Sequence, residues 1–430
     1  MNMPNIYIET YGCSNSQAEA EIMAGLLEQA GFKIIKNENF AELIIIVTCY
    51  VKSPTEQKIL FRIKQLKELH PKKKLIIAGC MPEGIYKTIA DIAPEASLVS
   101  THHIREIAEA VKKTLQEKRV EYLGESNEIK LCLPRIRKNP VIDIVPISNG
   151  CNSACSYCCV RFAKGKLFSY PKEMVVKEIE SALKEGCKEI WLTAQDTASY
   201  GLDEGKAKLP ELLKEITEIP GNFFVRVGMM NIRNIISIAS ELVEAFKNKK
   251  VYKFIHLPLQ SGSDEVLKSM NRGYTTSQFE NIVKAFKDSF KCQFWTDVIV
   301  GYPSEEKEDF LKTMNIIESV KPDWINVSKF GARPRTEAAK LRSLLSNIVK
   351  ERSKIISELV RKISLEKNKE WINWVGPVLI SEKGKKPGQW IGRNFAYKPV
   401  LVNNKESLLG RFVDIKITNT TSSHLIGLLR

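Results

Sequence analysis

The sequence predicts an α/β protein of three units: a doubly wound parallel sheet at the N-terminus, a partial (β/α)6 barrel, and a small C-terminal β-barrel. Two observations lead to this fold class. Apolar strand-like runs alternate with helical patterns through most of the chain, which is typical of parallel sheets covered by helices. The last part shows short β-rich runs separated by Gly and Pro, which indicates a small closed barrel. We expect the units to span residues 1–115, 138–345 and 365–430.

The first unit alternates strand, helix, strand, helix and strand. Strand-like runs at 5–12, 43–48 and 73–79 are separated by helical patterns at 16–29 and 54–69. Each strand-like run ends close to one cysteine, and these are Cys13, Cys49 and Cys80. Because the carboxyl ends of parallel strands share one edge of a sheet, we expect the three thiols to converge there.

The second unit repeats a strand-and-helix pattern after a polar linker at 116–138. The strand-like runs are 141–148, 189–196, 223–230, 253–260, 293–300 and 324–330. Six such units predict a parallel barrel, complete or partial, with its chemistry at the C-terminal mouth. A helical stretch at 346–368 leads to the last unit.

Composition limits the partners that the protein can have. The chain has 430 residues, and its 43% hydrophobic and 27% charged content is that of a soluble globular protein. No apolar run approaches the ~20 residues of a membrane span, and the N-terminus lacks a signal-peptide pattern, so we expect a cytoplasmic protein without a membrane partner. The net charge of +15 favours a polyanion such as nucleic acid, although a thermophile-like surface rich in Lys and Glu gives the same charge.

The stretch CNSACSYC at 151–158 directly follows the first strand of the second unit. Ten cysteines in a cytoplasmic chain indicate metal binding or catalysis rather than disulfides. Thiolates ligate zinc and iron–sulfur clusters, and both normally take four ligands. Cys151, Cys155 and Cys158 supply three, and Cys159 is poorly placed as a fourth because neighbouring side chains on an extended loop point apart. Three thiolates on a four-iron cluster leave one iron with an open position, which is a reaction site.

This loop, with Tyr157 before its last cysteine, resembles the radical S-adenosylmethionine (SAM) superfamily. The resemblance implies that the open iron chelates SAM and that an electron from the cluster cleaves SAM to a 5′-deoxyadenosyl radical. With TYGCSNSQAEAEIM, IVTCYV and IAGCMPE in the first unit and a TRAM-like last unit, nearly the whole chain is similar to the methylthiotransferases. In that family Cys13, Cys49 and Cys80 would hold a second cluster, whose open iron carries the sulfur that is inserted. The implied cofactors are two [4Fe–4S] clusters and SAM.

Three branches of that family differ in substrate: isopentenyladenosine in tRNA, an aspartate of a ribosomal protein, or N6-threonylcarbamoyladenosine in tRNA. The stretches LTAQDTASYGLD, VRVGMMNIRNI and SKFGARPRTEAAKL are most similar to the third, the archaeal and eukaryotic MtaB-like branch. This resemblance implies methylthiolation of the adenosine next to the anticodon, with tRNA, an external electron donor and a sulfur source as partners. From another class of function, a non-catalytic RNA-binding protein with structural metal remains open.

The family pattern also implies SAM contacts at the strand ends of the barrel. They are Tyr157, Gln195, Asp196, Arg226, Gln260, Ser261, Val300 and Gly301. Polar groups there can hydrogen-bond the ribose and carboxylate of SAM, and a Gly lets the backbone approach the adenine. The candidate RNA contacts are Arg161, Lys164, Lys166, Arg333 and Arg393. No catalytic residue beyond the cluster-bound groups is expected, and His256, inside an apolar strand, is expected to be a core histidine with a hydrogen-bond partner.

The C-terminal unit is basic, with eleven Lys or Arg against five Asp or Glu from residue 365 on, which leaves +6. This charge suits RNA phosphates. Its aromatic residues could stack on bases, although at least two of them should fill the core: Trp371, Trp374, Trp390 and Phe395. The cysteines outside the two groups are expected to be small buried hydrophobes: Cys132, Cys159, Cys187 and Cys292.

Overall fold

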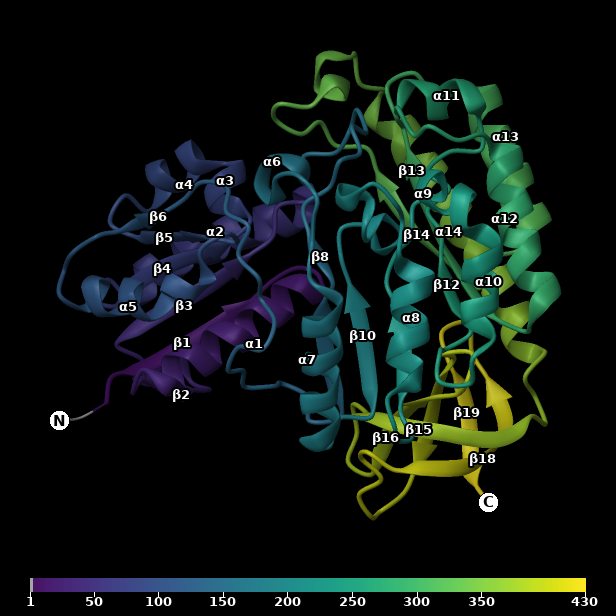
Figure 1. Ribbon diagram of the computed structural model, residues 1–430. Coiled ribbons are helices and arrows are strands. Elements are labelled where there is room, and N and C mark those ends of the chain that lie inside the picture. Colours follow the sequence, from purple (N-terminus) through teal and green to yellow (C-terminus); the bar gives the residue numbers. More distant parts are fainter. Residues whose placement is uncertain (1–2) are drawn as a thin grey trace.

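The computed structural model describes residues 3–430, and its N-terminal unit is a doubly wound parallel sheet (Figure 1). Six parallel strands stand in the order β2-β1-β3-β4-β5-β6. They are β1 Asn5–Thr10, β2 Lys33–Ile35, β3 Leu43–Thr48, β4 Lys74–Gly79, β5 Ser97–Ser100 and β6 Glu121–Tyr122. The LIIIVT run of β3 is buried throughout, as a central strand covered on both faces must be.

Helices cover both faces of this sheet, which confirms the doubly wound prediction. Helices α1 (Ser14–Gln29) and α5 (Ile107–Leu115) share one apolar core with one face. The other face packs against α2 (Ser53–Leu69), α3 (Met81–Gly84) and α4 (Tyr86–Ile92).

The segment expected to be a polar linker is instead packed against α1. Lys130 and Leu131 are each only 1% exposed, and the Ile136 amide donates to the Glu21 carbonyl at 2.9 Å. A Cβ added at Gly25 would lie 2.3 Å from the Arg135 amide nitrogen, so α1 requires a glycine where this segment crosses it. The segment connects the two units without a helix or strand after β6 (Glu121–Tyr122), but its polar residues find buried partners that only the tertiary fold brings to them.

The central unit is a partial barrel of parallel strands, as predicted. Its strands are β7 Ile142–Pro146, β10 Glu189–Thr193, β11 Phe224–Val227, β12 Phe254–His256, β13 Gln293–Val300 and β14 Trp324–Lys329. They form the sheets β11-β10-β7 and β12-β13-β14, which are joined by backbone bonds from Tyr252 to Val225 and from Met230 to His256. The short strands β8 (Ser148–Asn149) and β9 (Phe168–Ser169) pair beside the cysteine loop.

Helices surround the barrel on its outer side (Figure 1). The long ones are α7 Lys172–Lys184, α8 Leu209–Glu218, α10 Ala239–Lys247, α12 Thr276–Ser289, α13 Lys307–Val320 and α14 Ser346–Lys369. Short helices lie in the loops: α6 Arg161–Lys164, α9 Ile232–Ile235 and α11 Asp264–Ser269. Ile255, Val298 and Ile325 pack into the core beneath the outer helices, so the alternating residues of the same strands point into the barrel.

The C-terminal unit is a closed barrel in the order β15-β16-β17-β19-β18, as predicted. Its strands are β15 Val375–Lys383, β16 Gln389–Arg393, β17 Pro399–Asn403, β18 Phe412–Thr420 and β19 Leu425–Leu429. Trp371 and Trp390 are buried in its core, which confirms that at least two of the four aromatic residues are structural.

This small barrel closes the amino end of the central barrel, below β10 and β12 in Figure 1. The Tyr397 ring lies 4.9 Å from that of Tyr252 and 5.0 Å from that of Phe254. Lys398 Nζ pairs with Asp323 Oδ1 at 2.7 Å, with both side chains 3% exposed or less. The two barrels therefore share a buried interface.

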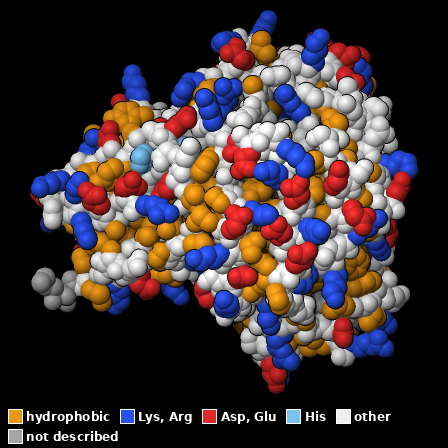
Figure 2. Space-filling model, viewed as in Figure 1, with side chains coloured by type: hydrophobic (Ala, Val, Ile, Leu, Met, Phe, Trp, Pro, Cys, Tyr) orange, Lys and Arg blue, Asp and Glu red, His pale blue; other side chains and the backbone are white. Residues whose placement is uncertain are grey.

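The outer surface shows no single basic patch on the face drawn in Figure 2, where Lys and Arg are interspersed with Asp and Glu. Within residues 3–430, no helix combines the length and apolar character needed to cross a membrane. Cys159 and Cys187 are buried as expected, and Cys292 is partly buried. The expectation for Cys132 is wrong: this thiol is exposed, because the packed linker turns outward there with a φ of 56°.

Candidate active site

The three N-terminal cysteines follow adjacent parallel strands at one edge of the sheet. Cys13 lies between β1 and α1, Cys49 follows β3, and Cys80 follows β4, where its amide donates to the Thr48 carbonyl at 3.2 Å. Gly12, with a φ of 115°, lies against Cys49, because a Cβ added to it would be 2.4 Å from the Cys49 Cβ. The structure therefore brings these three cysteines together, as the strand pattern predicts.

The environment of these thiols suits binding to a metal cluster. Burial raises the pKa of Cys49, and burial raises that of Cys80 to about 12, with neighbouring thiols adding to both shifts. Thiolates become stable in such a place when a cation binds them. Cys13 is exposed, which leaves one side of the group open. Three thiols and an open side fit a cluster with one free iron.

The second group, Cys151, Cys155 and Cys158, lies in an irregular loop after β8. The Ser153 amide points at the Cys151 sulfur at 3.4 Å, and burial raises the pKa of Cys151 and, to about 12, that of Cys158. Within residues 3–430, no three His, Cys, Asp or Glu side chains approach closely enough to share one ion. In a [4Fe–4S] cluster each thiolate binds its own iron, so its ligands need not approach a single ion.

Arg272 is a site residue that sequence reasoning missed. This side chain follows α11 in a buried turn, and its Nη1 lies 3.2 Å from the Cys155 sulfur and 3.4 Å from the Tyr157 hydroxyl. Its Nη2 donates to Asn231 Oδ1 at 3.0 Å. Arg272 thereby fixes the cysteine loop to the C-terminal end of β11. In the sequence Arg272 stands in the stretch MNRGY, which carries no pattern that marks it as a site residue.

Asp196 lies at the barrel mouth, but backbone and side-chain donors already surround its carboxylate. It accepts from the Asn231 amide at 2.9 Å, from Asn234 Nδ2 at 2.7 Å and from the Ala198 amide at 3.1 Å. Burial raises the pKa of Asp196 to about 6 in spite of these bonds. In this structure Asp196 organises the loops after β10 and β11.

Three other predicted contacts have buried polar atoms without a partner among the described residues. They are Gln195 Oε1, Gln260 Oε1 and Arg226 Nε. A buried polar atom without a partner costs stability unless a ligand or water satisfies it. Gln260 also has a φ of 67°, which is rare for a residue with a side chain and is typical of functional sites. These atoms mark the barrel mouth and interior as a ligand site.

The remaining predicted contacts have structural partners. Ser261 is buried and accepts from the Ser263 amide at 3.3 Å. Val300 packs in the core under the outer helices, so its side chain does not face the barrel interior. Gly301 has a φ of 75°, and a Cβ there would lie 2.5 Å from a methyl carbon of Val349 on α14. A glycine at 301 is thus required for helix packing.

The barrel interior is both aromatic and polar. The Arg226 guanidinium lies 5.1 Å from the ring centres of Trp191 and Phe254 and forms no ion pair within residues 3–430. His256, half-buried, is paired through Nε2 with Asp297 Oδ2 at 2.8 Å, as expected of a satisfied histidine. Its side chain points into the barrel, however, because the strand alternates with the core-facing Ile255.

The predicted RNA contacts divide into exposed and buried residues. Arg161 and Lys166 are exposed on the cysteine loop. Lys164 is 3% exposed and pairs with Glu19, and buried Arg333 pairs with Glu56. Arg393 pairs with Glu382 at 3.1 Å, beside the interface of the two barrels. Lys164 and Arg333 join units of the protein through these pairs, whereas Arg393 is paired within the C-terminal barrel. Their charges already have partners in the protein, and the RNA role of these three residues stays a prediction.

The two cysteine groups are connected by one side chain. The Tyr50 hydroxyl, next to Cys49, donates to the carbonyl oxygen of Cys159, next to Cys158, at 2.7 Å. Arg333 donates to the Tyr50 carbonyl and extends this contact to the loop after β14. The two loops therefore form one bonded unit.

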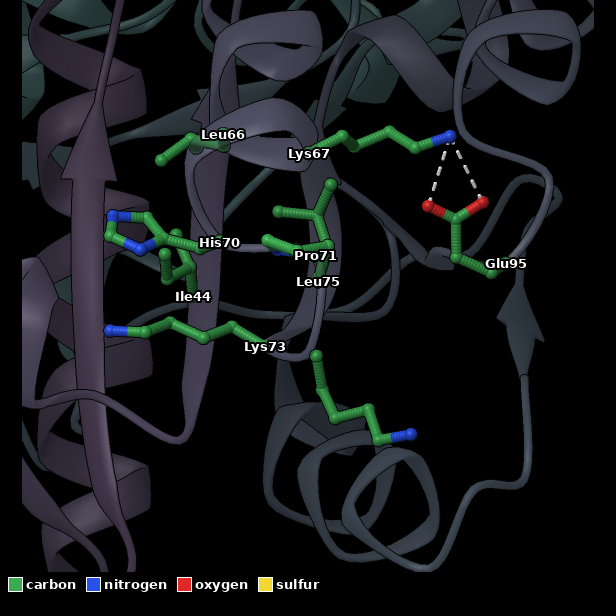
Figure 3. Close-up of a pocket in the computed structure, with 9 residues that line it drawn as sticks. Ile44, Leu66, Lys67, His70, Pro71, Lys73, Leu75 and Glu95 are labelled. Carbon is green, nitrogen blue, oxygen red and sulfur yellow. Dashed lines mark hydrogen bonds and ion pairs between the residues drawn. The ribbon is translucent and has the colours of Figure 1, made fainter.

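A hollow at the opposite end of the N-terminal sheet does not belong to this site. Figure 3 shows it near the starts of β3 and β4, with a volume of about 130 Å³ and a surface ion pair between Lys67 and Glu95. Ligands of open parallel sheets bind at the carboxyl ends of the strands, where the cysteines lie.

Comparison with known families covers each of the three units. Residues 5–101 match the Uncharacterized protein family UPF0004, residues 145–317 match the Radical SAM superfamily, and residues 375–429 match the TRAM domain. Among solved structures, the radical SAM methyltransferase TsrM from Kitasatospora setae is similar in fold. It has 14% sequence identity and a TM-score of 0.57, over 78% of this chain and 75% of that one.

Relatives extend over the full length. A probable threonylcarbamoyladenosine tRNA methylthiotransferase of Methanothermobacter thermautotrophicus is 43% identical over 98% of this chain and 99% of its own. One from Pyrococcus abyssi is 42% identical over 99% of both chains. The threonylcarbamoyladenosine tRNA methylthiotransferase of Drosophila melanogaster is 34% identical over 98% of this chain and 77% of its own.

Proposed function

Since this chain belongs to the radical SAM family of threonylcarbamoyladenosine tRNA methylthiotransferases, we propose that it methylthiolates N6-threonylcarbamoyladenosine next to the anticodon of tRNA. The family implies SAM and a [4Fe–4S] cluster. When bound, that cluster supplies the electron that cleaves SAM to a 5′-deoxyadenosyl radical. The product would carry the methylthio group at C2 of the base. The C–H bond at C2 is unactivated, so acid–base chemistry offers no easy way to replace its hydrogen with sulfur.

One observation carries the proposal: two groups of three cysteines lie in loops that the Tyr50–Cys159 hydrogen bond joins. We assign Cys151, Cys155 and Cys158 to the cluster that binds SAM. We assign Cys13, Cys49 and Cys80 to a second, auxiliary [4Fe–4S] cluster that presents the sulfur. The chain itself positions both groups.

Residues at the mouth of the barrel are assigned to SAM. Gln195 and Gln260 offer partnerless amide oxygens that suit the ammonium group or ribose hydroxyls. Tyr157 lies in the cysteine loop and Arg272 lies against it, and both would orient the cofactor there. Ser261 and the backbone at Gly301 remain candidate contacts of SAM, because they follow strands at the barrel mouth. Their hydrogen bonds to the Ser263 amide and to Glu305 stabilise the loops in which they lie.

Arg226 supports the choice of substrate within the family. The partly buried Arg226 guanidinium, whose Nε is buried and which forms no ion pair within residues 3–430, suits a carboxylate ligand. The threonylcarbamoyl group carries a carboxylate, whereas an isopentenyl group is wholly apolar. Trp191 beside Arg226 is partly exposed and provides a flat apolar surface for the base. We therefore assign Arg226 to the substrate rather than to SAM.

Several partners follow from this proposal. The basic C-terminal barrel would contact tRNA phosphates, and exposed Arg161 and Lys166 near the mouth would contact the anticodon loop. An electron donor and a sulfur source must come from outside the chain. The cytoplasm is the compartment that we expect, because the proposed substrate is tRNA.

The test uses anaerobically reconstituted enzyme with SAM, sulfide and a reductant. We expect about eight irons per chain and a 2-methylthio product, seen by nucleoside mass spectrometry, on tRNA that carries the threonylcarbamoyl group. Matched tRNA without that group is the control and should remain unmodified. Equal activity on isopentenyladenosine tRNA, or activity only on a ribosomal protein, would contradict the substrate assignment. A stable iron-free protein that still binds tRNA would favour a non-catalytic binding role.

A further inference from the structure

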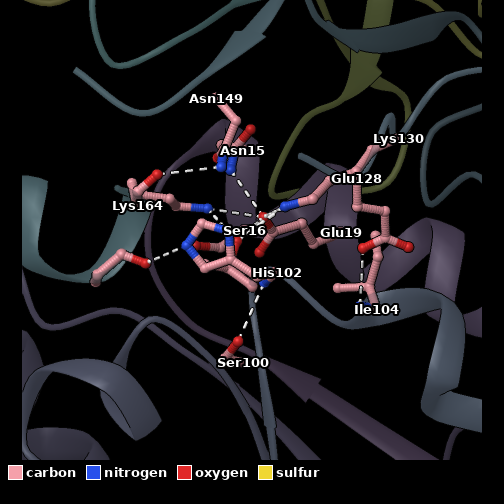
Figure 4. Close-up of polar contacts among 12 residues, drawn as sticks. Asn15, Ser16, Glu19, Ser100, His102, Ile104, Glu128, Lys130, Asn149 and Lys164 are labelled. Atoms are coloured by element: carbon pink, nitrogen blue, oxygen red, sulfur yellow. Dashed lines mark hydrogen bonds and ion pairs between the residues drawn. The ribbon is translucent and has the colours of Figure 1, made fainter. Parts of the chain in front are cut away.

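A buried polar cluster lies between the N-terminal unit and the central barrel. We call it the Glu19 cluster, and it consists of Glu19, Thr101, Lys130 and Lys164. One carboxylate oxygen, Glu19 Oε1, lies 2.7 Å from both lysine Nζ atoms, and all three charged side chains are 3% exposed or less. Figure 4 shows the carboxylate of Glu19 between the ammonium groups of Lys130 and Lys164.

The Glu19 cluster lies at the same edge of the sheet as the N-terminal cysteines. Glu19 is in the second turn of α1, the helix that begins directly after Cys13. Thr101 follows β5, and its amide donates to the carbonyl of Gly79, the residue before Cys80, at 3.0 Å. Lys164 ends α6 in the cysteine loop of the barrel, so its side chain crosses from one unit into the other.

The charges in this cluster do not balance. Two lysines share one carboxylate, and Glu128, which also acts on Lys130, is paired with Arg105 at 3.3 Å and with backbone amides. A buried positive charge without a matching anion is costly. The protein therefore has a place for one more negative charge beside these lysines.

Packing places Lys164 on the side of the cysteines, because α6, which Lys164 ends, contacts α3, the helix that begins directly after Cys80, and Ala163 shares an apolar core cluster with Cys80. Burial alone would lower the pKa of Lys164, but Cys80 and Glu19 hold it above its usual value, and Cys13 adds to the effect. Burial lowers the pKa of Lys130 against the pull of Glu19. Burial would raise the pKa of Glu19, but the two lysines lower it to about 2. Lys164 thus lies toward the thiols, and Lys130 lies on the far side of the carboxylate.

We propose that Lys164 is a positioning residue for the auxiliary cluster, where its ammonium group offsets the negative charge of the thiolates and of the anionic sulfur on the open iron. Glu19 and Thr101 hold the ammonium group in place, and Lys130 keeps Glu19 ionised. The inference rests on the proposed function, because it requires a cluster at Cys13, Cys49 and Cys80. It gives a role to the basic residue that ends the cysteine loop.

The experiment isolates the auxiliary cluster in the full-length chain. The parent protein carries Cys151→Ala, Cys155→Ala and Cys158→Ala and is reconstituted with iron and sulfide without oxygen. Iron content and a redox titration followed by electron paramagnetic resonance are measured. Removing a nearby positive charge disfavours the reduced cluster, so Lys164→Met should lower its midpoint potential.

Two variants control this measurement. Lys164→Arg keeps the charge and should keep a potential close to that of the parent. Lys130→Met removes the other partner of the same Glu19 oxygen, and it should shift the potential less than Lys164→Met does. This comparison separates a charge that faces the cluster from general damage to the Glu19 cluster.

The outcomes distinguish the two proposals. An unchanged potential in Lys164→Met, or equal shifts in the two Met variants, overturns the role of Lys164. If Lys164→Met binds no iron, Lys164→Arg decides the question. A cluster in Lys164→Arg with the midpoint potential of the parent supports the inference, and a midpoint potential far from that of the parent overturns it. A parent that itself binds no iron would instead refute the auxiliary cluster and with it the proposed function.

Discussion

Arg272 shows how a single side chain can organise the barrel site. Its guanidinium contacts the Cys155 sulfur, the Tyr157 hydroxyl and the Asn231 amide oxygen in a position that is only 6% exposed. Hydrogen bonds of a buried charged group are stronger than neutral ones and are costly to break. The orientation of the cysteine loop therefore depends on a residue more than a hundred positions away.

Replacing Arg272 should impair SAM cleavage. Arg272→Met removes a positive charge beside Cys155, so we expect a lower potential of the barrel cluster and at least a tenfold slower SAM cleavage. The iron bound at the N-terminal cysteines should remain. The control is Arg233→Met, an exposed arginine close to the same turn, which should retain normal cleavage. Equal rates in the two variants would show that the Cys155 contact is incidental.

Gln260 and Asp196 should behave differently when truncated. Gln260→Ala removes a partnerless group, so SAM affinity should fall by about 1.5–3 kcal/mol while the melting temperature stays close to normal. Asp196→Ala removes a carboxylate that three protein donors use, so it should lower the melting temperature as well. Calorimetric SAM binding and thermal unfolding measure both effects. Normal SAM binding by Gln260→Ala would show that Gln260 does not contact the cofactor.

At the scale of elements, the strands and the loops that follow them were the predictable part. Continuous apolar runs such as LIIIVT mark buried parallel strands, and the position of each cysteine after a strand follows directly. The linker and Lys164 were not predictable, since burial of a charged side chain depends on partners distant in sequence, such as Glu19. The direction of the His256 side chain was not predictable either, because only the barrel geometry decides which face of the strand points inward.

The contact between the two cysteine loops can be tested with Tyr50→Phe. Losing one buried hydrogen bond should cost about 1 kcal/mol of unfolding free energy. Because the two loops then move independently, we expect SAM cleavage to continue while less of it leads to methylthiolated tRNA. The ratio of 5′-deoxyadenosine to modified nucleoside measures this uncoupling. Tyr86→Phe removes the hydroxyl of an exposed tyrosine bound to Glu121 and is the matched control, with no change in the ratio.

At the scale of the whole molecule, the C-terminal barrel carries exposed lysines and also covers the amino end of the central barrel. Its exposed face carries basic residues, and its buried face closes the central barrel through Tyr397 and the Lys398–Asp323 pair. Deleting this unit would expose the apolar end of the central barrel, so a truncated chain does not test RNA binding alone.

Surface substitutions give a cleaner test of tRNA binding. Lys383, Lys385 and Lys386 are exposed on the C-terminal barrel. Changing all three to Ala should weaken tRNA binding and make it less sensitive to salt, by up to about one released ion for each phosphate that the variant no longer neutralises. SAM cleavage without tRNA should be unchanged. Substituting exposed lysines of two outer helices of the central barrel, Lys247 on α10 and Lys284 on α12, is the control and should alter tRNA affinity less.

The packed segment between the first two units has a consequence for how such proteins can evolve. Glu19 and Glu21 of helix α1 are buried. At Gly25 the crossing segment lies so close to the helix that no side chain fits there. A recombination event that joined this sheet to another barrel would leave the buried Glu19 carboxylate without Lys164. The sheet and the barrel are therefore expected to be inherited together, and sequence changes in α1 should be matched by changes at Lys130 and Lys164.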